Sequence, residues 1–319
     1  MKVLVTGGSG FVGARTIDRL LANGHEVVNL DVRVSDRHPE RTTLGDVRDA
    51  DACLRAMRGA DAVLHLAALY RDDVRPRELY YQVNVDGTGC IARAAAELGV
   101  RRIVFTSSFS VYGLEDAGKS ESGALDPVND YGRSKLAAES LLREWLQGDA
   151  SRSLQVLRPS VIFGEGNRGN VWTLLNQIAR GRFALIGRGA NRKSMAYVGN
   201  VAEFLLFLLG RSAPRYELYN YADKPDMSVS EIVDTAAREL GRSVLRVPVP
   251  GRIAMLLGYG GDVLGRLTGK SMTLNSERVR KFLADTTLPT ARLESTGFAR
   301  PFELNRAFVQ TIRSEFAQR

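Results

Sequence analysis

Tyr131 and Lys135 stand four residues apart in the run YGRSK, at the start of a segment whose composition predicts a helix to residue 146. Residues spaced in this way lie on one face of a helix, so the phenol and the ammonium can act at one point. A free tyrosine has a pKa of about 10, and lowering that pKa by roughly three units requires about 4 kcal/mol. An ammonium about 4 Å away supplies about that much at an effective dielectric constant of about 20. The pair therefore predicts a phenol that acts as a base, although these few residues alone also suit a solvated pair on an exposed helix.

A glycine-rich turn follows the first apolar run of the chain. Gly7, Gly10 and Gly13 lie in TGGSGFVG, directly between KVLVT and a segment with helical spacing that extends to residue 21. Glycine permits a tight turn and lets backbone approach a pyrophosphate, and the helix N-terminus offers free N–H groups to that anion. Because a strand precedes the turn and a helix follows it, the turn predicts a dinucleotide site.

Asp31 stands at the end of the next expected strand, HEVVNLD. A carboxylate at this point accepts hydrogen bonds from both ribose hydroxyls of a dinucleotide and repels a 2′-phosphate, which favours NAD over NADP. Arg33 and Arg37 follow closely and would suit a 2′-phosphate, so NADP stays open.

Strands alternate with helices along the first half of the chain, as in a parallel sheet with helices on both faces. This predicts an α/β fold with a doubly wound, Rossmann-type parallel sheet and a smaller C-terminal α/β lobe for substrate. The expected strands are 2–6, 25–31, 61–68, 101–108 and 153–160, and the expected helices are 7–21, 51–57, 79–98 and 131–146. The alternation becomes irregular after residue 164. Residues 1–165 are therefore assigned to the NAD-binding domain and 166–319 mainly to the lobe, with later segments returning to the first domain.

Composition narrows the class of protein further. The chain has 319 residues, of which 44% are hydrophobic and 25% charged, as is ordinary for a soluble globular protein. It starts MKVLVTGG without a signal sequence, has no apolar run of about 20 residues, and holds two cysteines and three histidines. These features predict a cytoplasmic protein without a disulfide framework, metal site or integral membrane segment. The net charge of +8 suits an acidic partner, and the scattered arginines favour a phosphorylated small molecule over nucleic acid.

Gly7-x-x-Gly10-x-x-Gly13 together with Tyr131-x-x-x-Lys135 resembles the extended short-chain dehydrogenase/reductase family. Within that family the chain is similar to nucleotide-sugar epimerases and dehydratases of the UDP-galactose 4-epimerase type. Further motifs carry the resemblance along nearly the whole chain, namely GDVRD, HLAA, NVDGT, FTSSFSVYG, RPSVIFGEG, GNVWTLLNQIARG, NRKSMAYVGNVAEFL and TARLESTGFARPF. The resemblance implies that the cofactor is NAD, bound by Gly7, Gly10, Phe11, Val12, Gly13, Asp31, Asp46, Val47, Leu66, Ala67, Ala68, Asn84, Tyr131, Lys135 and Pro159.

The same resemblance implies a catalytic trio of Ser108, Tyr131 and Lys135. Ser108 would donate a hydrogen bond to the developing carbonyl oxygen, and Lys135 would hold the nicotinamide ribose as well as lower the pKa of Tyr131. Tyr131 would remove the proton of a sugar 4-hydroxyl while hydride passes to NAD⁺, and hydride would return to the opposite face of the 4-keto sugar. The implied substrate is a UDP- or dTDP-hexose used for surface polysaccharide synthesis. This nucleotide diphospho-sugar would be held by Ser108, Ser110, Tyr131, Asn170, Arg192, Lys193 and Arg278.

Departures from the family patterns bear on the reaction. The 4,6-dehydratases carry Asp-Glu after the serine, whereas this chain has Phe109 and Ser110, which argues against dehydration. Val161 stands where many members have an asparagine that contacts substrate. An NAD(P)-dependent 4-ketosugar reductase and a 3β-hydroxysteroid-like dehydrogenase therefore stay open. A catalytically inactive NAD-sensing regulator is a further alternative, but such relatives lose the tyrosine that this chain keeps.

Two further segments concern partners. The helices around 79–98 and 131–147 carry alanine and leucine at helical spacing on their outward faces, and the resemblance implies that they pair with their copies in a homodimer. The apolar segment 250–270 is interrupted by glycines. It suits a packed helix of the lobe, with an amphipathic helix that touches a membrane surface as the alternative.

Overall fold

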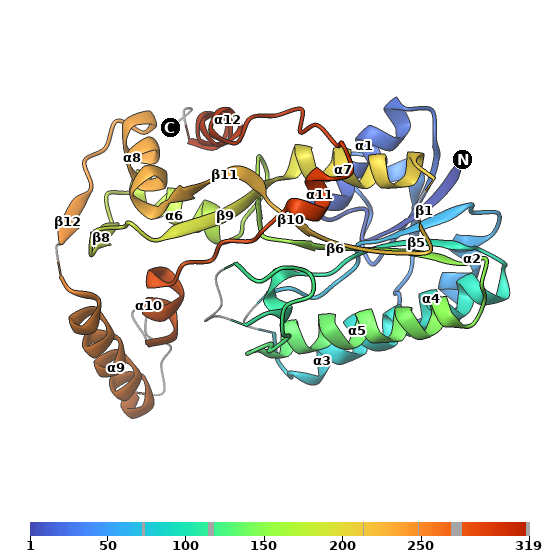
Figure 1. The fold of residues 1–319 in the computed structure, drawn as a ribbon, viewed down its shortest axis with the longest axis horizontal. Helices are drawn as coiled ribbons and strands as arrows, with labels where there is room; N and C mark the ends of the chain where they lie inside the picture. Colours follow the sequence, from blue (N-terminus) through green and yellow to red (C-terminus); the bar gives the residue numbers. More distant parts are fainter. Residues whose placement is uncertain (72–73, 114–117, 213, 248, 269–275, 317–319) are drawn as a thin grey trace.

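A parallel sheet of seven strands forms the centre of the molecule. The computed structural model describes residues 1–71, 74–113, 118–212, 214–247, 249–268 and 276–316. The strand order is β10-β6-β5-β4-β1-β2-β3, and each neighbouring pair runs parallel (Figure 1). The strands are β1 (Lys2–Thr6), β2 (Glu26–Asp31), β3 (Thr42–Leu44), β4 (Ala62–His65), β5 (Arg102–Thr106), β6 (Ser153–Pro159) and β10 (Tyr216–Tyr221). This confirms the predicted Rossmann-type sheet, whose strand order reverses between β1 and β4, where ligands of such sheets bind.

Helices cover both faces of this sheet because its central strands are apolar on both sides (Figure 1). One face is covered by α1 (Phe11–Ala22) and α7 (Val198–Gly210), which pack on each other. The other face is covered by α2 (Ala50–Met57), α4 (Gly87–Glu97) and α5 (Asp130–Gln147). A short helix, α3 (Glu78–Tyr81), continues into α4 through a π-helical turn, η2 (Gln82–Asp86). Both β10 and α7 lie beyond residue 165 in the chain and still belong to this layer.

The remaining elements form the C-terminal lobe. Its strands are β7 (Val161–Phe163), β9 (Arg192–Tyr197) and β11 (Asp223–Ser228) in one sheet, and β8 (Ala184–Ile186) and β12 (Leu245–Val247) in another. Its helices are α6 (Asn170–Ala179), α8 (Val229–Glu239), α9 (Gly251–Thr268), α10 (Ser276–Leu283) and α12 (Leu304–Phe316). The short helix α11 (Ala291–Glu294) instead packs on β10 of the central sheet. The lobe has its own hydrophobic cluster, built from α6, α8, α12 and the strands between them. Figure 1 shows α9 and α10 beside each other, with α9 extending away from the lobe.

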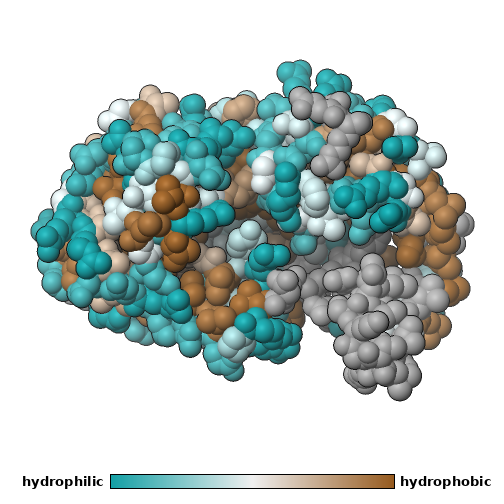
Figure 2. Space-filling view, turned by 180° about the vertical axis from the view of Figure 1, so that it is seen from behind, coloured by the Kyte–Doolittle hydropathy of each residue, from teal (hydrophilic) through white to brown (hydrophobic). Residues whose placement is uncertain are grey.

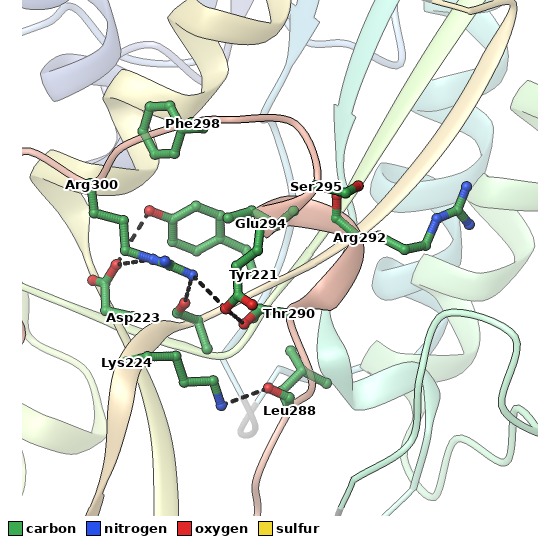
Figure 3. Close-up of polar contacts among 12 residues, drawn as sticks. Tyr221, Asp223, Lys224, Leu288, Thr290, Arg292, Glu294, Ser295, Phe298 and Arg300 are labelled. Atoms are coloured by element: carbon green, nitrogen blue, oxygen red, sulfur yellow. Dashed lines mark hydrogen bonds and ion pairs between the residues drawn. The ribbon is translucent and has the colours of Figure 1, made fainter.

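A buried charged cluster fixes the segment that follows α10 to the end of β10 (Figure 3). The Asp223 carboxylate accepts the Tyr197 N–H at 2.6 Å and the Tyr221 hydroxyl at 3.3 Å, and the Arg300 Nε lies 3.4 Å from it. Burial raises the pKa of Asp223 to about 6. Arg300 also donates to the Ala222 carbonyl at 2.9 Å. The chain after α10 therefore returns to the sheet at a defined point.

Candidate active site

The glycine turn connects β1 to α1 and packs against the loop that follows β4. Gly7 has a φ of +72°, which side-chain-bearing residues rarely adopt, and a Cβ added there would lie 2.7 Å from the Ala67 nitrogen. A Cβ on Gly13 would lie 2.3 Å from the Gly7 carbonyl oxygen. Within the described residues 1–71, α1 has no side-chain cap and no acidic residue in its first turn. The free N–H groups at this helix end fit the pyrophosphate of a dinucleotide.

The first turn of α1 also joins the cofactor half of the molecule to the lobe. Gly10 is the N-cap of this helix, and Phe11 and Val12 are its first residues. Both side chains are half-buried and pack against the hydrophobic cluster of the lobe. Arg15, one turn further along, pairs with Glu165 at 3.5 Å. The helix end that fits the pyrophosphate thus contacts the glycine turn on one side and the lobe on the other.

Asp31 ends β2 and accepts the backbone N–H groups of Ser9 and Arg33 at 3.0 and 3.2 Å. The two arginines that would suit a 2′-phosphate have other partners. Arg33 donates to the Ser9 carbonyl at 2.8 Å, and Arg37 pairs with Asp18 at 2.5 Å. Both guanidinium groups therefore already have partners within the protein, and the Asp31 carboxylate stays at the strand end where a ribose is predicted to lie.

Asp46 and Val47, predicted to contact the adenine, follow β3. Arg48 donates to both carboxylate oxygens of Asp46 at 2.6 to 3.0 Å, and these bonds lower the pKa of that carboxyl below its ordinary value. Val47 is buried, and a Cβ added to Gly87 would lie 2.7 Å from its side chain. The turn is therefore ordered by its own ion pair and by close packing on α4.

Leu66, Ala67 and Ala68 form the loop after β4, where the cofactor is predicted to lie. Thr6, the last residue of β1, fixes this loop. Its carbonyl accepts the Leu66 N–H at 3.1 Å, and its hydroxyl oxygen accepts the Ala67 N–H at 3.2 Å. The loop consequently lies at the point where the strand order reverses, beside the glycine turn.

Asn84 lies in the π-helical turn η2, with 2% of its surface exposed. Its amide exchanges two hydrogen bonds with the backbone of Leu69, at 2.8 and 3.0 Å, and donates to the Ser134 hydroxyl at 2.9 Å. Ser134 in turn donates to the Tyr131 carbonyl at 2.8 Å. Asn84 thus ties the loop after β4 to the first turn of α5. Its contact with the cofactor stays a prediction.

Ser108 follows β5 and caps a short 3₁₀ helix, η3 (Phe109–Val111). Its hydroxyl accepts the Ser110 N–H and donates to the Ser110 hydroxyl, both at 3.1 Å. A Cβ added to Gly132 would lie 2.5 Å from the Ser110 carbonyl oxygen. The start of α5 is therefore pressed against the serine loop, which places Tyr131 beside the loop that carries Ser108.

Lys135 is almost completely buried, with 2% of its surface exposed, and its Nζ lies 4.2 Å from the centre of the Phe105 ring. Burial lowers the pKa of Lys135 to about 7, and the charge of Glu139 opposes this shift. Helical spacing indicates that Lys135 shares a face with Tyr131, but it does not reveal the burial. Burial thus disfavours the charged form of the ammonium that is predicted to lower the pKa of Tyr131.

A buried ion pair lies behind the predicted catalytic residues. Arg158 in β6 donates to the two carboxylate oxygens of Glu139 in α5 at 2.8 and 2.5 Å, and both side chains are 1% exposed. Glu139 also accepts the Ser107 hydroxyl at 2.5 Å, and Arg158 donates to the Tyr112 hydroxyl at 2.8 Å. These bonds join α5, β6 and the serine loop in one network.

Each member of this network neighbours a predicted site residue. Ser107 precedes Ser108, and Glu139 lies one turn beyond Lys135 on α5. Pro159, predicted to lie beside the nicotinamide, follows Arg158 at the end of β6 and is buried. The sequence analysis missed the network, although a glutamate four residues after the lysine, on the same helix face, was an available signal.

His65 is a second residue that the motifs did not single out. It is fully buried, and its ring nitrogens lie 2.7 and 2.9 Å from the hydroxyl oxygens of Thr6 and Thr88. Its ring stacks on Phe105 with centres 5.4 Å apart. Burial, followed by the nearby charge of Lys135, lowers the pKa of His65 to about 3. The neutral imidazole helps to hold Phe105, the ring that also contacts Lys135.

The predicted substrate residues of the lobe lie on different elements. Asn170 is exposed and is the first residue of α6. Arg192 is exposed at the start of β9, where its guanidinium donates to the Asp226 carbonyl and its N–H donates to Asp285 at 2.6 Å. Asn170 therefore offers a helix N-terminus, and Arg192 a cation, on the surface of the lobe.

Lys193 and Arg278 complete the predicted set. The Lys193 ammonium donates to the Ala284 carbonyl at 2.6 Å, just beyond the end of α10. Burial lowers its pKa to about 8. Arg278 lies on α10, and its side chain is outside the described part of the structure. Their roles towards a substrate stay predictions.

Comparison with known proteins adds a family and relatives. Residues 3–222 match the model of the NAD dependent epimerase/dehydratase family. The chain is 45% identical over 316 residues to an N-acetyl-alpha-D-glucosaminyl-diphospho-ditrans,octacis-undecaprenol 4-epimerase of Escherichia coli O157:H7, covering 99% of this chain and 95% of the relative. It is 27% identical to a UDP-glucose 4-epimerase of Vibrio cholerae, covering 84% of this chain and 85% of that one. The solved structure of MoeE5 in complex with UDP-glucuronic acid and NAD superposes with a TM-score of 0.79 at 26% identity, over 100% of both chains.

Proposed function

Because the chain belongs to the NAD-dependent epimerase/dehydratase family, we propose that it inverts C4 of an N-acetylhexosamine joined through a diphosphate to a polyprenyl lipid. The enzyme uses NAD as its cofactor. One observation carries the choice of substrate, which is the 45% identity, over nearly the full length of both chains, to an epimerase whose name specifies such a lipid.

Tyr131 carries out the proton transfer. Its phenolate takes the proton of the sugar 4-hydroxyl, and the phenol returns a proton to the same oxygen after inversion. Ser108 donates a hydrogen bond to that oxygen while carbonyl character develops, which stabilises the oxidised sugar. Bound NAD⁺ supplies the reversible hydride acceptor for C4. The reaction causes no net oxidation or reduction, because the proton and the hydride both return to the sugar.

Lys135 tunes this proton transfer through its charge. A protonated ammonium close to Tyr131 favours the phenolate, whereas the neutral amine does not. The burial that brings the pKa of Lys135 to about 7 makes its charge sensitive to the group bound beside it. Glu139 favours the charged form, and the Glu139–Arg158 pair holds α5 in register with the serine loop.

The diphosphate is proposed to bind at the lobe. Asn170 places a helix N-terminus at its surface, and Arg192 and Lys193 bring two cations at the start of β9. Charge-assisted hydrogen bonds from such groups offset the cost of removing a diphosphate from water. Arg278 on the neighbouring α10 stays a further proposed contact.

A nucleotide carrier is the second candidate. It is favoured by the similarity to UDP-glucose 4-epimerases and to a structure solved with a UDP-sugar. The two carriers share the diphosphate, which bears a polyprenyl chain in one and a nucleoside in the other. Turnover of polyprenyl-diphospho-N-acetylglucosamine and of UDP-N-acetylglucosamine, measured by chromatography of the released sugars, separates them. We expect N-acetylgalactosamine from the lipid-linked substrate, and inversion of the UDP-sugar alone would contradict the lipid proposal.

The same experiment distinguishes epimerisation from net oxidation or reduction. An epimerase leaves the absorbance of NADH unchanged while the sugar is inverted, whereas a 4-ketosugar reductase or a steroid-like dehydrogenase changes it with each turnover. We also propose that the reaction occurs in the cytoplasm and serves surface polysaccharide synthesis, which uses sugars activated as diphosphates.

A homodimer through α4 and α5 is proposed as the working form. These two helices pack on each other, and Leu136, Ala137 and Leu141 stay half-buried on α5. Half-buried apolar side chains on a surface helix are typical of helices that pack against a second pair of helices. Light scattering at micromolar protein should give twice the mass of the chain, and Leu141→Glu should shift it to the monomer.

A further inference from the structure

Helix α9 carries an exposed apolar stripe. Ile253, Leu256 and Tyr259 have 44%, 68% and 49% of their surfaces exposed, and Arg252 is exposed beside them. At about 100° per residue these side chains occupy about a third of the helix circumference. Figure 2 views the molecule from behind, so β12 and α9, which lie at the left of Figure 1, are at its right. Hydrophobic surface is visible along this right-hand edge. Exposed apolar side chains gathered on one helix face, together with a cation, are typical of a helix that lies in a membrane interface.

A pocket of about 740 Å³ lies between α9 and α10. Its lining combines apolar groups with two guanidinium groups, and consists of Gly251, Arg252, Met255, Leu256, Tyr259, Arg280, Leu283 and Ala284. A hydrogen bond joins the two helices, because the Ser276 N–H donates to Asp262 at 3.3 Å. The backbone at Gly251 also approaches Leu283, since a Cβ added there would lie 3.5 Å from the leucine side chain. Cations beside apolar side chains are complementary to a molecule in which an anionic phosphate is joined to a hydrocarbon chain, namely a phospholipid or a polyprenyl phosphate.

This pocket is connected to the proposed diphosphate site. Ala284, which lines the pocket, accepts the hydrogen bond of Lys193 at 2.6 Å. The next residue, Asp285, accepts the Arg192 N–H at 2.6 Å. The two proposed diphosphate ligands are thus bonded to neighbouring residues, of which Ala284 lines the pocket. A lipid chain entering between α9 and α10 would have its diphosphate at the start of β9.

We propose that the exposed faces of α9 and α10 dock on an anionic lipid bilayer and thereby give the site access to its lipid-linked substrate. We choose an anionic bilayer as the partner because of the positive charge of this surface. Arg252 and Arg280 are exposed at the pocket, and the chain as a whole carries a net charge of +8. In the part of the chain that the structure describes, no helix is long and apolar enough to cross a bilayer. An exposed apolar stripe with arginines beside it is typical of contact with the surface of an anionic bilayer. The proposal rests on the lipid-linked substrate proposed above.

Vesicle flotation tests this surface with the full chain loaded with NAD. Vesicles of phosphatidylcholine with phosphatidylglycerol are compared with vesicles of phosphatidylcholine alone. We expect the protein to float with the anionic vesicles, and Leu256→Glu to weaken that binding about tenfold or more. Arg252→Gln and Arg280→Gln should each weaken it about fivefold, and added salt should reduce the difference between them and the native protein. Leu44→Glu, at the end of the edge strand β3 and 59% exposed, is the matched control and should float like the native protein.

Specific outcomes overturn the proposal. A native protein that ignores anionic vesicles at low salt, or a Leu256→Glu protein that floats unchanged, would do so. A lower mass of Leu256→Glu in light scattering, without native flotation, would assign the stripe to a second copy of the chain. Epimerisation of detergent-dispersed lipid-linked sugar is measured in parallel. Activity without flotation rejects docking and keeps the proposed function, whereas flotation without lipid turnover rejects the proposed substrate alone.

Discussion

The proposed catalytic edge of the sheet, around Tyr131, Lys135 and Arg158, and the α9–α10 surface, around Leu256 and Arg280, combine the same kinds of side chain in opposite ways. At the catalytic edge, Lys135 and Arg158 are buried, and each contacts an aromatic ring or a carboxylate of the chain itself. At the α9–α10 surface, Arg280 and Leu256 face outwards beside a pocket. Chemistry at one atom requires groups that are fixed before the substrate arrives, whereas docking on a surface requires groups that the partner itself will cover.

The largest effect expected is at the centre of the catalytic edge. Tyr131→Phe removes only the hydroxyl that transfers the proton, so the rate of epimerisation should fall by about a hundredfold to ten-thousandfold. Bound NAD, measured by absorbance after denaturation, should remain nearly stoichiometric. Near-native turnover of this variant would mean that Tyr131 does not transfer the proton. The proposed difference between the two regions would then be wrong.

The next largest effect should be on the free energy of unfolding, to which the buried Glu139–Arg158 ion pair contributes. Glu139→Gln leaves the Arg158 guanidinium buried without its counter-charge, which should cost about 3–5 kcal/mol of unfolding free energy. Glu303→Gln is the matched control, because its partner Arg306 is 88% exposed and surface pairs contribute about 0–1 kcal/mol. Urea denaturation measures both. Equal effects of the two substitutions would mean that the catalytic edge is not held by this pair.

Burial of Lys135 predicts a pH dependence of the NAD-free protein. Its pKa falls from 10.5 to about 7 on folding, so between these values the unfolded chain binds more protons than the folded one. The unfolding free energy should therefore rise with pH in this window, with Lys135 contributing up to about 1.4 kcal/mol per pH unit. Lys135→Met should lose that part of the slope. Parallel stability curves for the two proteins between pH 7 and pH 10 would contradict the assigned burial.

The smallest effect expected concerns the lobe. Arg192→Ala should raise KM for the diphosphate-linked sugar about tenfold and leave bound NAD unchanged, because one charge-assisted hydrogen bond is lost. Arg306→Ala, on an exposed arginine of α12, is the control for the change in net charge. A loss of kcat without a change in KM would place Arg192 with the catalytic edge instead.

The sequence could predict the elements that carry the proposed catalytic edge because the constraints on them are local. The glycine turn, the four-residue spacing of Tyr131 and Lys135 and the strand-helix alternation each follow from neighbouring residues, and the sheet agrees with them. The Glu139–Arg158 pair joins residues 19 apart in the chain, and His65 meets Thr88 across 23. Such contacts depend on how the elements pack, which periodicity does not determine.

The lobe could be predicted less completely for a related reason. The sequence of segment 250–270 predicts a packed helix of the lobe, with a surface helix as the alternative, because its apolar residues fit both. Only the fold shows that Leu256 is 68% exposed and that Met255 and Leu256 both line the pocket beside α10. The anchoring of Lys193 on Ala284 likewise joins β9 to the end of α10 across 91 residues.

The most direct test of the central claim tracks the hydrogen on C4 of the sugar. Tyr131 and its neighbours are proposed to invert this carbon by transient oxidation, in which hydride leaves and returns within one complex. Polyprenyl-diphospho-N-acetylglucosamine with deuterium at C4 is converted by the purified enzyme, and the released sugars are examined by mass spectrometry. We predict N-acetylgalactosamine that keeps its deuterium. Inverted sugar that has lost the deuterium to water, or no inversion with any diphosphate-linked hexosamine, would contradict the account.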